Sequence, residues 1–573
     1  MSPLENLIQK LVSHLEVIYG KQDHTQLVED LIGTMGIRDH FFEPATFANH
    51  WDQKDVVIIT YGDTFLRPGK LPLEELRAFL KKRVDDLVSW VHVLPYFPWT
   101  SDDGFAVSDY CQVDQELGDW SSIEALSAEY SLMSDLVVNH CSASHEWFGQ
   151  FQQGEEPGCH FFIEASASDD LTQVVRPRTF DLLRPTSTPS GIKNVWCTFG
   201  HDQVDLNYAE PKLLVELVKI IRQHLEHGVR IFRLDAVAFL WKERGTTCIN
   251  LRQTHEIVRL FRTLIEHVRP DALMITETNI PNQENLSYFG NSNEAHGIYN
   301  FSLPPLLLHA FVTGKSSYLK QWMMGMPPAQ PGTFYFNFIA SHDGIGLRPA
   351  EGLLPEQEIE TLVNAVKSRG GFVSERTLPG GKVKPYELNI SLFDAFGDEE
   401  SFICAHAILL ALEGIPAFYI HSLIATRNDY QKYEQSGHKR HLNRHQWNSS
   451  ELDLMLDDPE SSHCRVFSRL KRLIRLRKEQ PAFHPNATQF TLHLGDGIFA
   501  FWRQSIDRAS HVFCFHNISN QEQEISLASV NLVVTEDWFD LISGVPLELD
   551  RPELVLRPYQ FVWLVNQRKH LPY

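Results

Sequence analysis

The stretch GVRIFRLDAVAFLW (228–241) reads as a buried strand, yet it carries Arg233 and Asp235 two residues apart. A strand directs residues i and i+2 to the same face, so the cation and the carboxylate point to one side. Burying charge is costly unless the charges are paired or used. The stretch therefore predicts a core strand that aims a fixed ion pair at a functional pocket.

Seven further apolar segments end in polar or charged residues in the same way, and helical patterns such as 211–228 separate most of them. Near-continuously apolar strands that alternate with helices are typical of a parallel sheet covered on both faces. The sequence therefore predicts an α/β fold of the (β/α)8 TIM-barrel type. The eight predicted strands cover 56–63, 90–98, 132–140, 230–237, 273–279, 297–301, 335–343 and 415–420.

The pattern changes at several places along the chain, which predicts additions to the barrel. Residues 1–50 have helical periodicity and form a helical N-terminal extension, and residues 51–484 form the catalytic barrel. Two gaps are too long for simple connections, so we expect an inserted subdomain at 141–205 and an acceptor-loop insertion at 346–395. Short alternating strands over 485–573 predict a C-terminal antiparallel β domain.

Composition excludes several classes of protein. The formal net charge of −22 argues against nucleic acid and anionic membranes as partners. No segment reaches the roughly 18 apolar residues of a membrane span, and the N-terminus lacks the pattern of a signal peptide. The eight cysteines are scattered without a CxxC pair, which favours reduced thiols in the cytoplasm and no zinc site. We expect small-molecule partners only, in a monomer or homodimer.

Three acidic residues stand at the ends of three predicted strands: Asp235, Glu277 and Asp343. Barrel enzymes place their chemistry at this end of the strands. Two carboxylates facing each other suit glycosyl transfer, in which one attacks the sugar and the other donates and accepts a proton. Metal-assisted lyases and aldolase-type enzymes also use acidic strand ends, so spacing alone leaves the reaction open.

Local motifs narrow the choice. DLVVNH (135–140), FRLDAV (232–237), ITETN (275–279) and ASHDGIG (340–346) resemble, in order, the four conserved regions of the α-amylase superfamily, glycoside hydrolase family 13. The resemblance implies that Asp235 is the nucleophile, Glu277 the general acid/base and Asp343 the transition-state stabiliser.

The same resemblance implies supporting roles for four more residues. Arg233 holds the nucleophile ionised, while His140 and His342 hydrogen-bond sugar hydroxyls. Asn139 binds calcium in some amylase relatives, but here we expect it to form hydrogen bonds near the nucleophile. No metal site is therefore expected.

Further segments resemble the sucrose phosphorylase branch of this superfamily: VHVLPYFPWTSDDGF (91–105), VRPRTF (175–180), KPYELN (384–389) and LNRHQW (442–447). The resemblance implies that Asp102 binds the far hydroxyl of the glucosyl ring, with Arg444 as its ion-pair partner. Phe105 would form an apolar wall against the sugar.

The two loops of this branch that meet phosphate and the acceptor supply the remaining candidates. Arg178, Lys384 and Tyr386 are suited to anion contacts, because guanidinium, ammonium and hydroxyl donors bind phosphate oxygens. Glu387 lies at a position that contacts the acceptor in this branch. The implied activity is that of a retaining phosphorylase, a hexosyltransferase that uses inorganic phosphate as co-substrate and no cofactor.

The acceptor is the open part of this prediction. The N-terminal extension and the KPYELN loop look like those of phosphorylases that act on glucosylglycerol or glucosylglycerate. Glucosylglycerol is favoured because Glu387 would repel a carboxylate, although Lys384 and Arg178 would suit glycerate. Sucrose phosphorylase, sucrose 6-phosphate phosphorylase, an α-glucosidase or transglucosidase, and a non-enzymatic amylase-like subunit are the alternatives.

Overall fold

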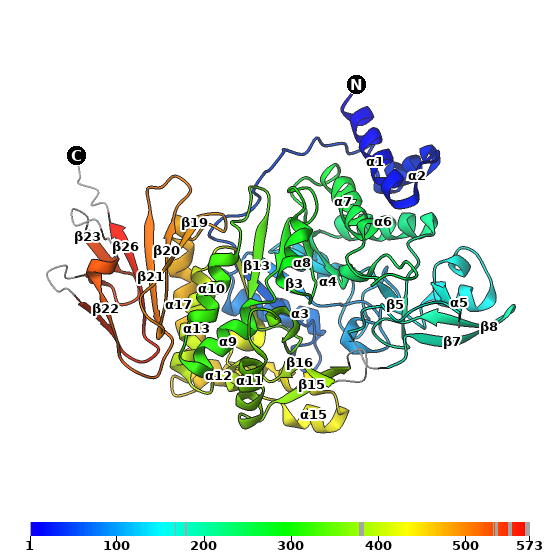
Figure 1. The fold of residues 1–573 in the computed structure, drawn as a ribbon. Coiled ribbons are helices and arrows are strands. Elements are labelled where there is room, and N and C mark those ends of the chain that lie inside the picture. Colours follow the sequence, from blue (N-terminus) through cyan, green and yellow to red (C-terminus); the bar gives the residue numbers. More distant parts are fainter. Residues whose placement is uncertain are drawn as a thin grey trace.

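The structure is a computed structural model. It describes residues 2–166, 168–177, 180–377, 383–530, 532, 537–547 and 553–567. A barrel occupies the middle of the molecule, with an antiparallel sheet at one side and two N-terminal helices at one end (Figure 1).

Eight parallel strands close into the barrel in the order β1-β17-β13-β12-β11-β10-β4-β3. Each coincides with one of the eight predicted segments, so the predicted fold class is confirmed. All positions of β1, β3, β11, β12, β13 and β17 are buried, as expected of strands covered by side chains inside and helices outside. The strands are β1 (Val57–Thr60), β3 (Trp90–Val93), β4 (Ser131–Val137), β10 (Val229–Asp235), β11 (Leu273–Thr276), β12 (Gly297–Tyr299), β13 (Phe334–Phe338) and β17 (Ile415–Tyr419).

Helices follow the barrel strands and cover the outside of the barrel. The last turns of α13 (Glu399–Ala411) are buried on all sides, because this helix contacts both α17 (Ser462–Lys478) and strand β21 (His511–Asn517) of the C-terminal sheet. The other main barrel helices are α3 (Pro72–Arg83), α4 (Trp120–Ser127), α6 (Pro211–Glu226), α7 (Arg252–Glu266), α9 (Leu303–Thr313) and α10 (Ser317–Gly325).

The N-terminal segment forms helices α1 (Pro3–Tyr19) and α2 (Thr25–Met35), which pack against α7 and α6 respectively. Ser2 and Glu5 form a reciprocal capping box that starts α1. His14 of α1 bonds Glu256 of α7 at 2.6 Å. The extension therefore adds a packed layer to the barrel helices.

Both long gaps begin at the carboxyl ends of barrel strands and contain regular structure. The first holds α5 (Glu146–Gln153), a pairing of β5 (His140–Ser142) with β9 (Gln203–Asp205), and the sheet β6-β8-β7. In that sheet β6 covers Glu164–Ala165, β7 covers Leu183–Thr188 and β8 covers Gly191–Trp196. The second holds α11 (Glu356–Ser368) and the sheet β14-β16-β15, formed by Ile345–Gly346, Val383–Asn389 and Phe372–Thr377.

The C-terminal part is a six-stranded antiparallel sheet with a separate two-stranded sheet, β22-β25. The six strands are β19 (Thr488–Leu492), β20 (Ile498–Gln504), β21 (His511–Asn517), β26 (Phe561–Gln567), β23 (Asp537–Asp540) and β24 (Val545–Pro546), and the other two are β22 (Gln523–Ser526) and β25 (Glu553–Leu556). All eight cysteines are free thiols. No described helix is both long enough and apolar enough to cross a membrane.

A buried arginine ties this sheet to the barrel. Arg503 of β20 is fully buried and donates to three backbone carbonyls: Ala411 at 2.6 Å, His484 at 2.8 Å and Ala487 at 3.3 Å. We expect Arg503→Met to lower the free energy of unfolding by about 3 kcal/mol, because it leaves buried carbonyls without a donor.

Urea unfolding monitored by tryptophan fluorescence measures this loss. Arg508→Met is the matched control, since Arg508 is exposed in the turn that follows β20. Equal unfolding midpoints for the two variants would contradict the assigned role of Arg503.

Candidate active site

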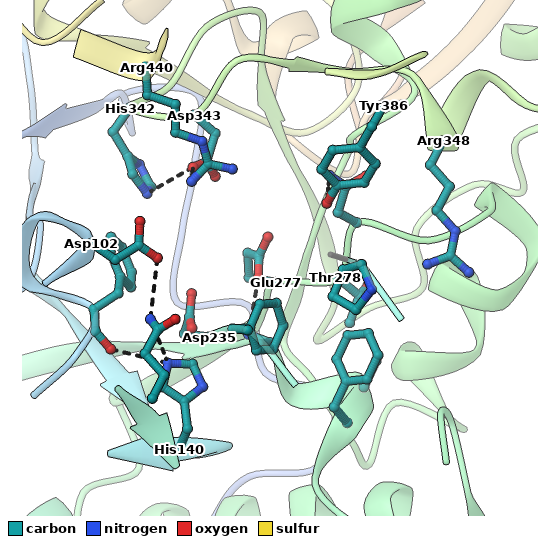
Figure 2. Close-up of a pocket in the computed structure, with 18 residues that line it drawn as sticks. Asp102, His140, Asp235, Glu277, Thr278, His342, Asp343, Arg348, Tyr386 and Arg440 are labelled. Atoms are coloured by element: carbon teal, nitrogen blue, oxygen red, sulfur yellow. Dashed lines mark hydrogen bonds and ion pairs between the residues drawn. The ribbon is translucent and has the colours of Figure 1, made fainter. Parts of the chain in front are cut away.

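An open pocket of about 690 Å³ lies at the carboxyl ends of the barrel strands. Asp235, Glu277 and Asp343 line it: Asp235 ends β10, Glu277 directly follows β11, and Asp343 lies in the loop after β13. In Figure 2, Asp235 and Glu277 lie between a wall with Asp102 and His140 and an opposite wall with Tyr386 and Arg348. The structure thus brings together the three carboxylates that the sequence placed at strand ends.

Arg233 lies behind the pocket and orients Asp235. Its Nη1 donates to Asp235 Oδ1 at 2.8 Å and also to Asp135. His92 bonds the second oxygen of Asp135 at 2.7 Å, which fixes that carboxylate in turn. Arg233 is not part of the pocket lining, and its contact with the carboxylate of Asp235 is the one that the resemblance implies.

Glu277 is held by the backbone of the neighbouring strand end. The amide of Ala236 donates to Glu277 Oε2 at 3.1 Å, while Arg233 Nη2 lies 3.8 Å from the same oxygen. Ala236 has a left-handed backbone, with φ of 50°. An alanine held in this conformation carries strain, which is common where a backbone group must be aimed at a site.

The two carboxyls differ in their contact with the guanidinium. Burial raises the pKa of Asp235, and the charge of Glu277 raises it further. Burial likewise raises the pKa of Glu277. Two neighbouring buried carboxyls therefore retain a proton more readily than an exposed carboxyl does. Because Arg233 lies 2.8 Å from Asp235 and 3.8 Å from Glu277, the ionised form belongs to Asp235 and the proton to Glu277.

Asp343 has a different environment. Burial disfavours its ionised form, but the nearby Arg440, His342 and Arg444 hold the pKa of this carboxyl well below its usual range. Arg440 Nη1 lies 2.7 Å from Asp343 Oδ1, and Arg444 Nη2 lies 3.8 Å from it. Asp343 is therefore a fixed negative charge in the pocket.

The predicted sugar-binding side chains form one wall. The ring of Phe105 stacks on His342 with centroids 5.0 Å apart. His140 Nε2 bonds the carbonyl of Phe105 at 3.1 Å. Burial lowers the pKa of His140, and it lowers that of His342 to about 3, so both rings are neutral at pH 7. Neutral imidazoles can hydrogen-bond hydroxyls without adding charge.

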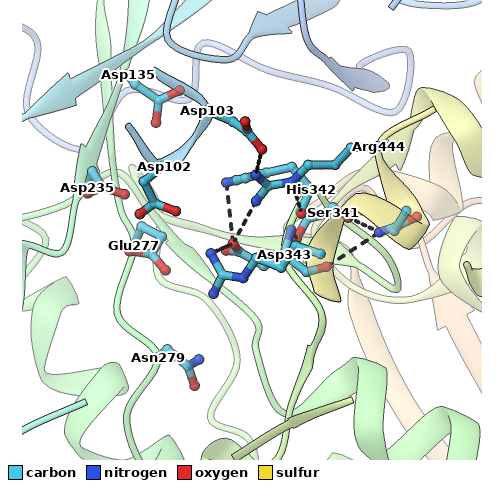
Figure 3. A network of polar contacts seen from close by, with 12 residues as sticks. Asp102, Asp103, Asp135, Asp235, Glu277, Asn279, Ser341, His342, Asp343 and Arg444 are labelled. Carbon is cyan, nitrogen blue, oxygen red and sulfur yellow. Dashed lines mark hydrogen bonds and ion pairs between the residues drawn. The ribbon is translucent and has the colours of Figure 1, made fainter. Parts of the chain in front are cut away.

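The predicted Asp102–Arg444 ion pair is wrong. Arg444 pairs with Asp103, which also contacts His441 Nε2 at 2.8 Å, whereas Asp102 lines the pocket and accepts from Gln203 at 3.3 Å (Figure 3). Both aspartates have left-handed backbones, with φ of 55° and 48°, so the turn sends their side chains in different directions. Arg444 therefore stands behind the pocket.

The opposite wall contains Tyr386 of β16 but not Lys384. Lys384 Nζ pairs with Glu356 at 2.7 Å and lines a separate groove against α11. A bulge causes this separation, because the register of β16 against β15 shifts between Pro385 and Glu387. The extra residue resets the alternation of side chains, so positions 384 and 386 do not share a face. The predicted role of Lys384 is wrong.

Glu387 does not line the pocket either. Its side chain is only 2% exposed, and both of its oxygens accept from Arg440, at 3.0 and 2.7 Å. The predicted contact of Glu387 with the acceptor is therefore wrong. Arg178 lies outside the described residues, but Pro177 of the same loop lines the pocket.

Sequence reasoning missed several pocket residues, among them Asn279, Arg348 and Arg440. Asn279 lies inside the motif ITETN, and Arg440 lies two residues before the segment LNRHQW (442–447). Arg348 follows ASHDGIG by two residues, so a cation directly after this motif was the signal available.

Asn139, which binds calcium in some amylase relatives, has a lysine beside it in this structure. Lys242 Nζ donates to Asn139 Oδ1 at 2.7 Å and lies 2.7 Å from Asp205 Oδ2. Another group of side chains with the spacing of metal ligands lies on the surface away from the pocket, and consists of Glu156, Cys159 and His160. Glu156 is already paired with Lys212 at 3.1 Å.

Comparison with known proteins agrees with this geometry. Residues 87–343 match the family model described as alpha amylase, catalytic domain. Over 571 residues the chain is 41% identical to the glucosylglycerate phosphorylase of Allomeiothermus silvanus, covering 98% of this chain and 99% of that protein. The chain belongs to the sucrose phosphorylase branch of the α-amylase superfamily.

Members of this branch with other acceptors are more distant. The glucosylglycerol phosphorylase of Marinobacter adhaerens is 30% identical over 428 residues, covering 72% of this chain and 85% of that protein. The crystal structure of sucrose 6F-phosphate phosphorylase from Thermoanaerobacter thermosaccharolyticum superposes with a TM-score of 0.72 at 22% identity, covering 88% of this chain and 98% of that one, and so shows the shared fold. Within the sucrose phosphorylase branch, this chain is a glycoside phosphorylase.

Proposed function

We propose that the enzyme catalyses the reversible phosphorolysis of 2-O-α-D-glucosyl-D-glycerate to α-D-glucose 1-phosphate and D-glycerate, with retention of configuration. The similarity to the glucosylglycerate phosphorylase of Allomeiothermus silvanus, at 41% identity over 98% of the chain, supports the choice of acceptor. The observation that carries it in the structure is a cation in the acceptor wall of the pocket that forms no ion pair within the described residues.

That cation is Arg348. It lines the pocket beside Tyr386, and it forms no ion pair with any residue in the described part of the chain. Burial lowers the pKa of Arg348 and the nearby Arg376 guanidinium lowers it further, and these effects outweigh the opposing effects of Tyr386, Glu284 and Glu351. A half-buried guanidinium with this environment is stabilised by an anion, and its two parallel N–H groups match a carboxylate.

A second group in this wall suits a hydroxyl. The Oδ1 atom of Asn279 is buried and has no hydrogen-bond donor among the described residues. Glycerate offers a carboxylate for Arg348 and a free hydroxyl for Asn279. Glycerol offers only hydroxyls, which would leave the charge of Arg348 without a partner.

The argument that favoured glucosylglycerol depended on Glu387 repelling a carboxylate. Because Arg440 binds both oxygens of Glu387, the pair presents no net charge to the acceptor. The comparisons do not confirm glucosylglycerol, and the geometry removes the reason for preferring it.

The proposed mechanism has two displacements. Asp235 attacks the anomeric carbon while Glu277 donates its proton to the departing oxygen of glycerate, and Asp343 stabilises the oxocarbenium-like transition state. An oxygen of hydrogen phosphate then attacks the same carbon, gives its proton to Glu277 and releases Asp235. Two inversions give net retention, and Glu277 ends with the proton it started with.

No cofactor is required in this scheme, and inorganic phosphate is the co-substrate. The eight free thiols favour a reducing compartment, and we propose the cytoplasm.

Replacing Arg348 by methionine tests the acceptor. With α-D-glucosyl fluoride as donor, so that phosphate is absent, we expect wild-type enzyme to prefer D-glycerate to glycerol. Arg348→Met should raise KM for glycerate by about 50-fold, since a charge-assisted bidentate contact is lost. KM for glycerol should change little. Fluoride release against acceptor concentration measures both values.

Lys384→Met is the matched control, because it removes a cation from the same strand as Tyr386 but outside the pocket. A wild-type enzyme that transfers to glycerol faster than to glycerate, or equal losses for both acceptors in Arg348→Met, would overturn the proposed acceptor.

A further inference from the structure

Arg440 joins two carboxylates that come from different parts of the fold. It belongs to the 3-10 turn η6 (Lys439–Asn443) that follows β17. Its Nη1 lies 2.7 Å from Asp343 Oδ1, while Nε and Nη2 donate to Glu387 at 3.0 and 2.7 Å. The guanidinium of Arg440 therefore makes a bidentate contact with Glu387 and a single contact with Asp343. In Figure 2 its guanidinium lies beside Asp343 at the edge of the pocket.

Glu387 is built into the fold in a way that serves this contact. A Cβ atom at Gly344 would lie 2.6 Å from Glu387 Cγ, so only glycine lets this side chain lie against the backbone directly after Asp343. Glu387 is buried, and the bidentate contact with Arg440 balances its charge. A carboxylate buried in this manner would be costly without the guanidinium.

We propose that Arg440 and Glu387 are positioning residues of glucosyl transfer: Glu387 fixes the guanidinium, and the guanidinium holds Asp343 ionised and oriented toward the sugar. This inference rests on the proposed double displacement, in which Asp343 stabilises the transition state. Because Tyr386 and Glu387 are adjacent in β16, the strand that carries an acceptor contact also supports the carboxylate that acts on the sugar.

The other charged and titratable groups around Asp343 do not replace this contact. Arg444 lies 3.8 Å away and is paired with Asp103. The remaining groups that interact with Asp343 electrostatically are Arg233, Glu277, His342, Tyr61 and Tyr419. Within the described residues, Arg440 is thus the cation closest to Asp343.

The test uses exchange of labelled inorganic phosphate into α-D-glucose 1-phosphate, which requires no acceptor. We expect Arg440→Gln to lower the exchange rate at pH 7 by about 100-fold. Asp343 loses its nearest counter-charge in this variant, so its pKa should rise. The fall in rate at acid pH, the acid limb of the pH profile, should then begin about one pH unit higher, or become steeper because protonation of a second carboxylate, Asp343, also stops the reaction. Arg440→Lys should return the acid limb toward its wild-type position while the rate stays low, since an ammonium cannot hold both carboxylates.

Arg440→Gln leaves the buried carboxylate of Glu387 without a cation, and this variant therefore risks misfolding. The double variant Glu387→Gln/Arg440→Gln avoids that risk, because two amides keep hydrogen bonds and remove both charges. It should move the acid limb in the same direction as Arg440→Gln but by less, because the negative charge of Glu387 is removed as well. Lys439→Gln is the control: Lys439 is exposed in the same turn and donates to the carbonyl of Val373 at 2.7 Å. Its profile should match wild type.

An acid limb that stays at its wild-type position and slope in both Arg440→Gln and the double variant would overturn this inference, even where the rate falls. That outcome differs from failure of the proposed acceptor. Wild-type enzyme that exchanges phosphate but does not cleave glucosylglycerate would refute the acceptor and leave the test of Arg440 intact.

Discussion

Asp235→Asn is expected to lower the rate of phosphorolysis by about 10⁴-fold or more. An amide oxygen is too weak a nucleophile to form the glucosyl-enzyme, although it keeps the hydrogen bond from Arg233 and the shape of the pocket. Mass spectrometry of enzyme quenched after mixing with α-D-glucosyl fluoride measures the intermediate. Wild type should gain the mass of one glucosyl group, and the variant should gain none.

Asp63→Asn controls for the loss of a strand-end carboxylate in general. Asp63 follows β1 and lines a neighbouring pocket with Lys432 and Gln446, outside the lining of the catalytic pocket. It should retain the adduct. A glucosylated Asp235→Asn enzyme, or one with turnover near wild type, would show that another residue attacks the sugar.

The fold was predictable because its signal is local. The eight barrel strands lie in mostly apolar segments, so those at 230–237 and 415–420 stood out without knowledge of their neighbours. The carboxylates were predictable for the same reason: Asp235 and Glu277 each come at or directly after the last residue of such a strand. Parallel strands in a closed barrel then bring these ends together.

The partners of the charged residues were not predictable in this way. Asp102 and Asp103 are chemically identical neighbours, and only the left-handed turn decides which of them meets Arg444. The bulge in β16 similarly places the side chain of Tyr386 in the pocket and that of Lys384 outside it. A one-residue shift in a strand or turn moves a side chain to the other face, and no pattern of residue types encodes it.

Pairing also changes what a residue means for specificity. Glu387 alone indicates a site that rejects anions, whereas Glu387 bound to Arg440 is electrostatically neutral. The reverse holds for Arg348. In the sequence nothing distinguishes it from the other cations, but in the structure it lines the pocket and forms no ion pair among the described residues. The acceptor that we propose therefore depends on which charges remain unpaired.

Glu277→Gln is expected to separate proton transfer from nucleophilic attack. Glycerate must be protonated as it leaves, so cleavage of glucosylglycerate should fall by about 10³-fold. Fluoride leaves without a proton, so formation of the glucosyl adduct from α-D-glucosyl fluoride should fall by about 10-fold or less. Stopped-flow fluorescence or quenched-flow mass spectrometry with the two donors measures the difference.

The pH dependence gives a second test of the same residue. Burial raises the pKa of Glu277, and the acid form that donates the proton is present below that pKa. Cleavage of glucosylglycerate by wild type should therefore decline as pH rises through this pKa, whereas adduct formation from the fluoride, which needs no donor, should not decline there. In Glu277→Gln the basic limb should be absent with either donor, because glutamine does not titrate. A basic limb that persists in the variant, or an equal loss for glucosylglycerate and glucosyl fluoride, would assign the proton donor to another group and reduce Glu277 to a residue that shapes the pocket.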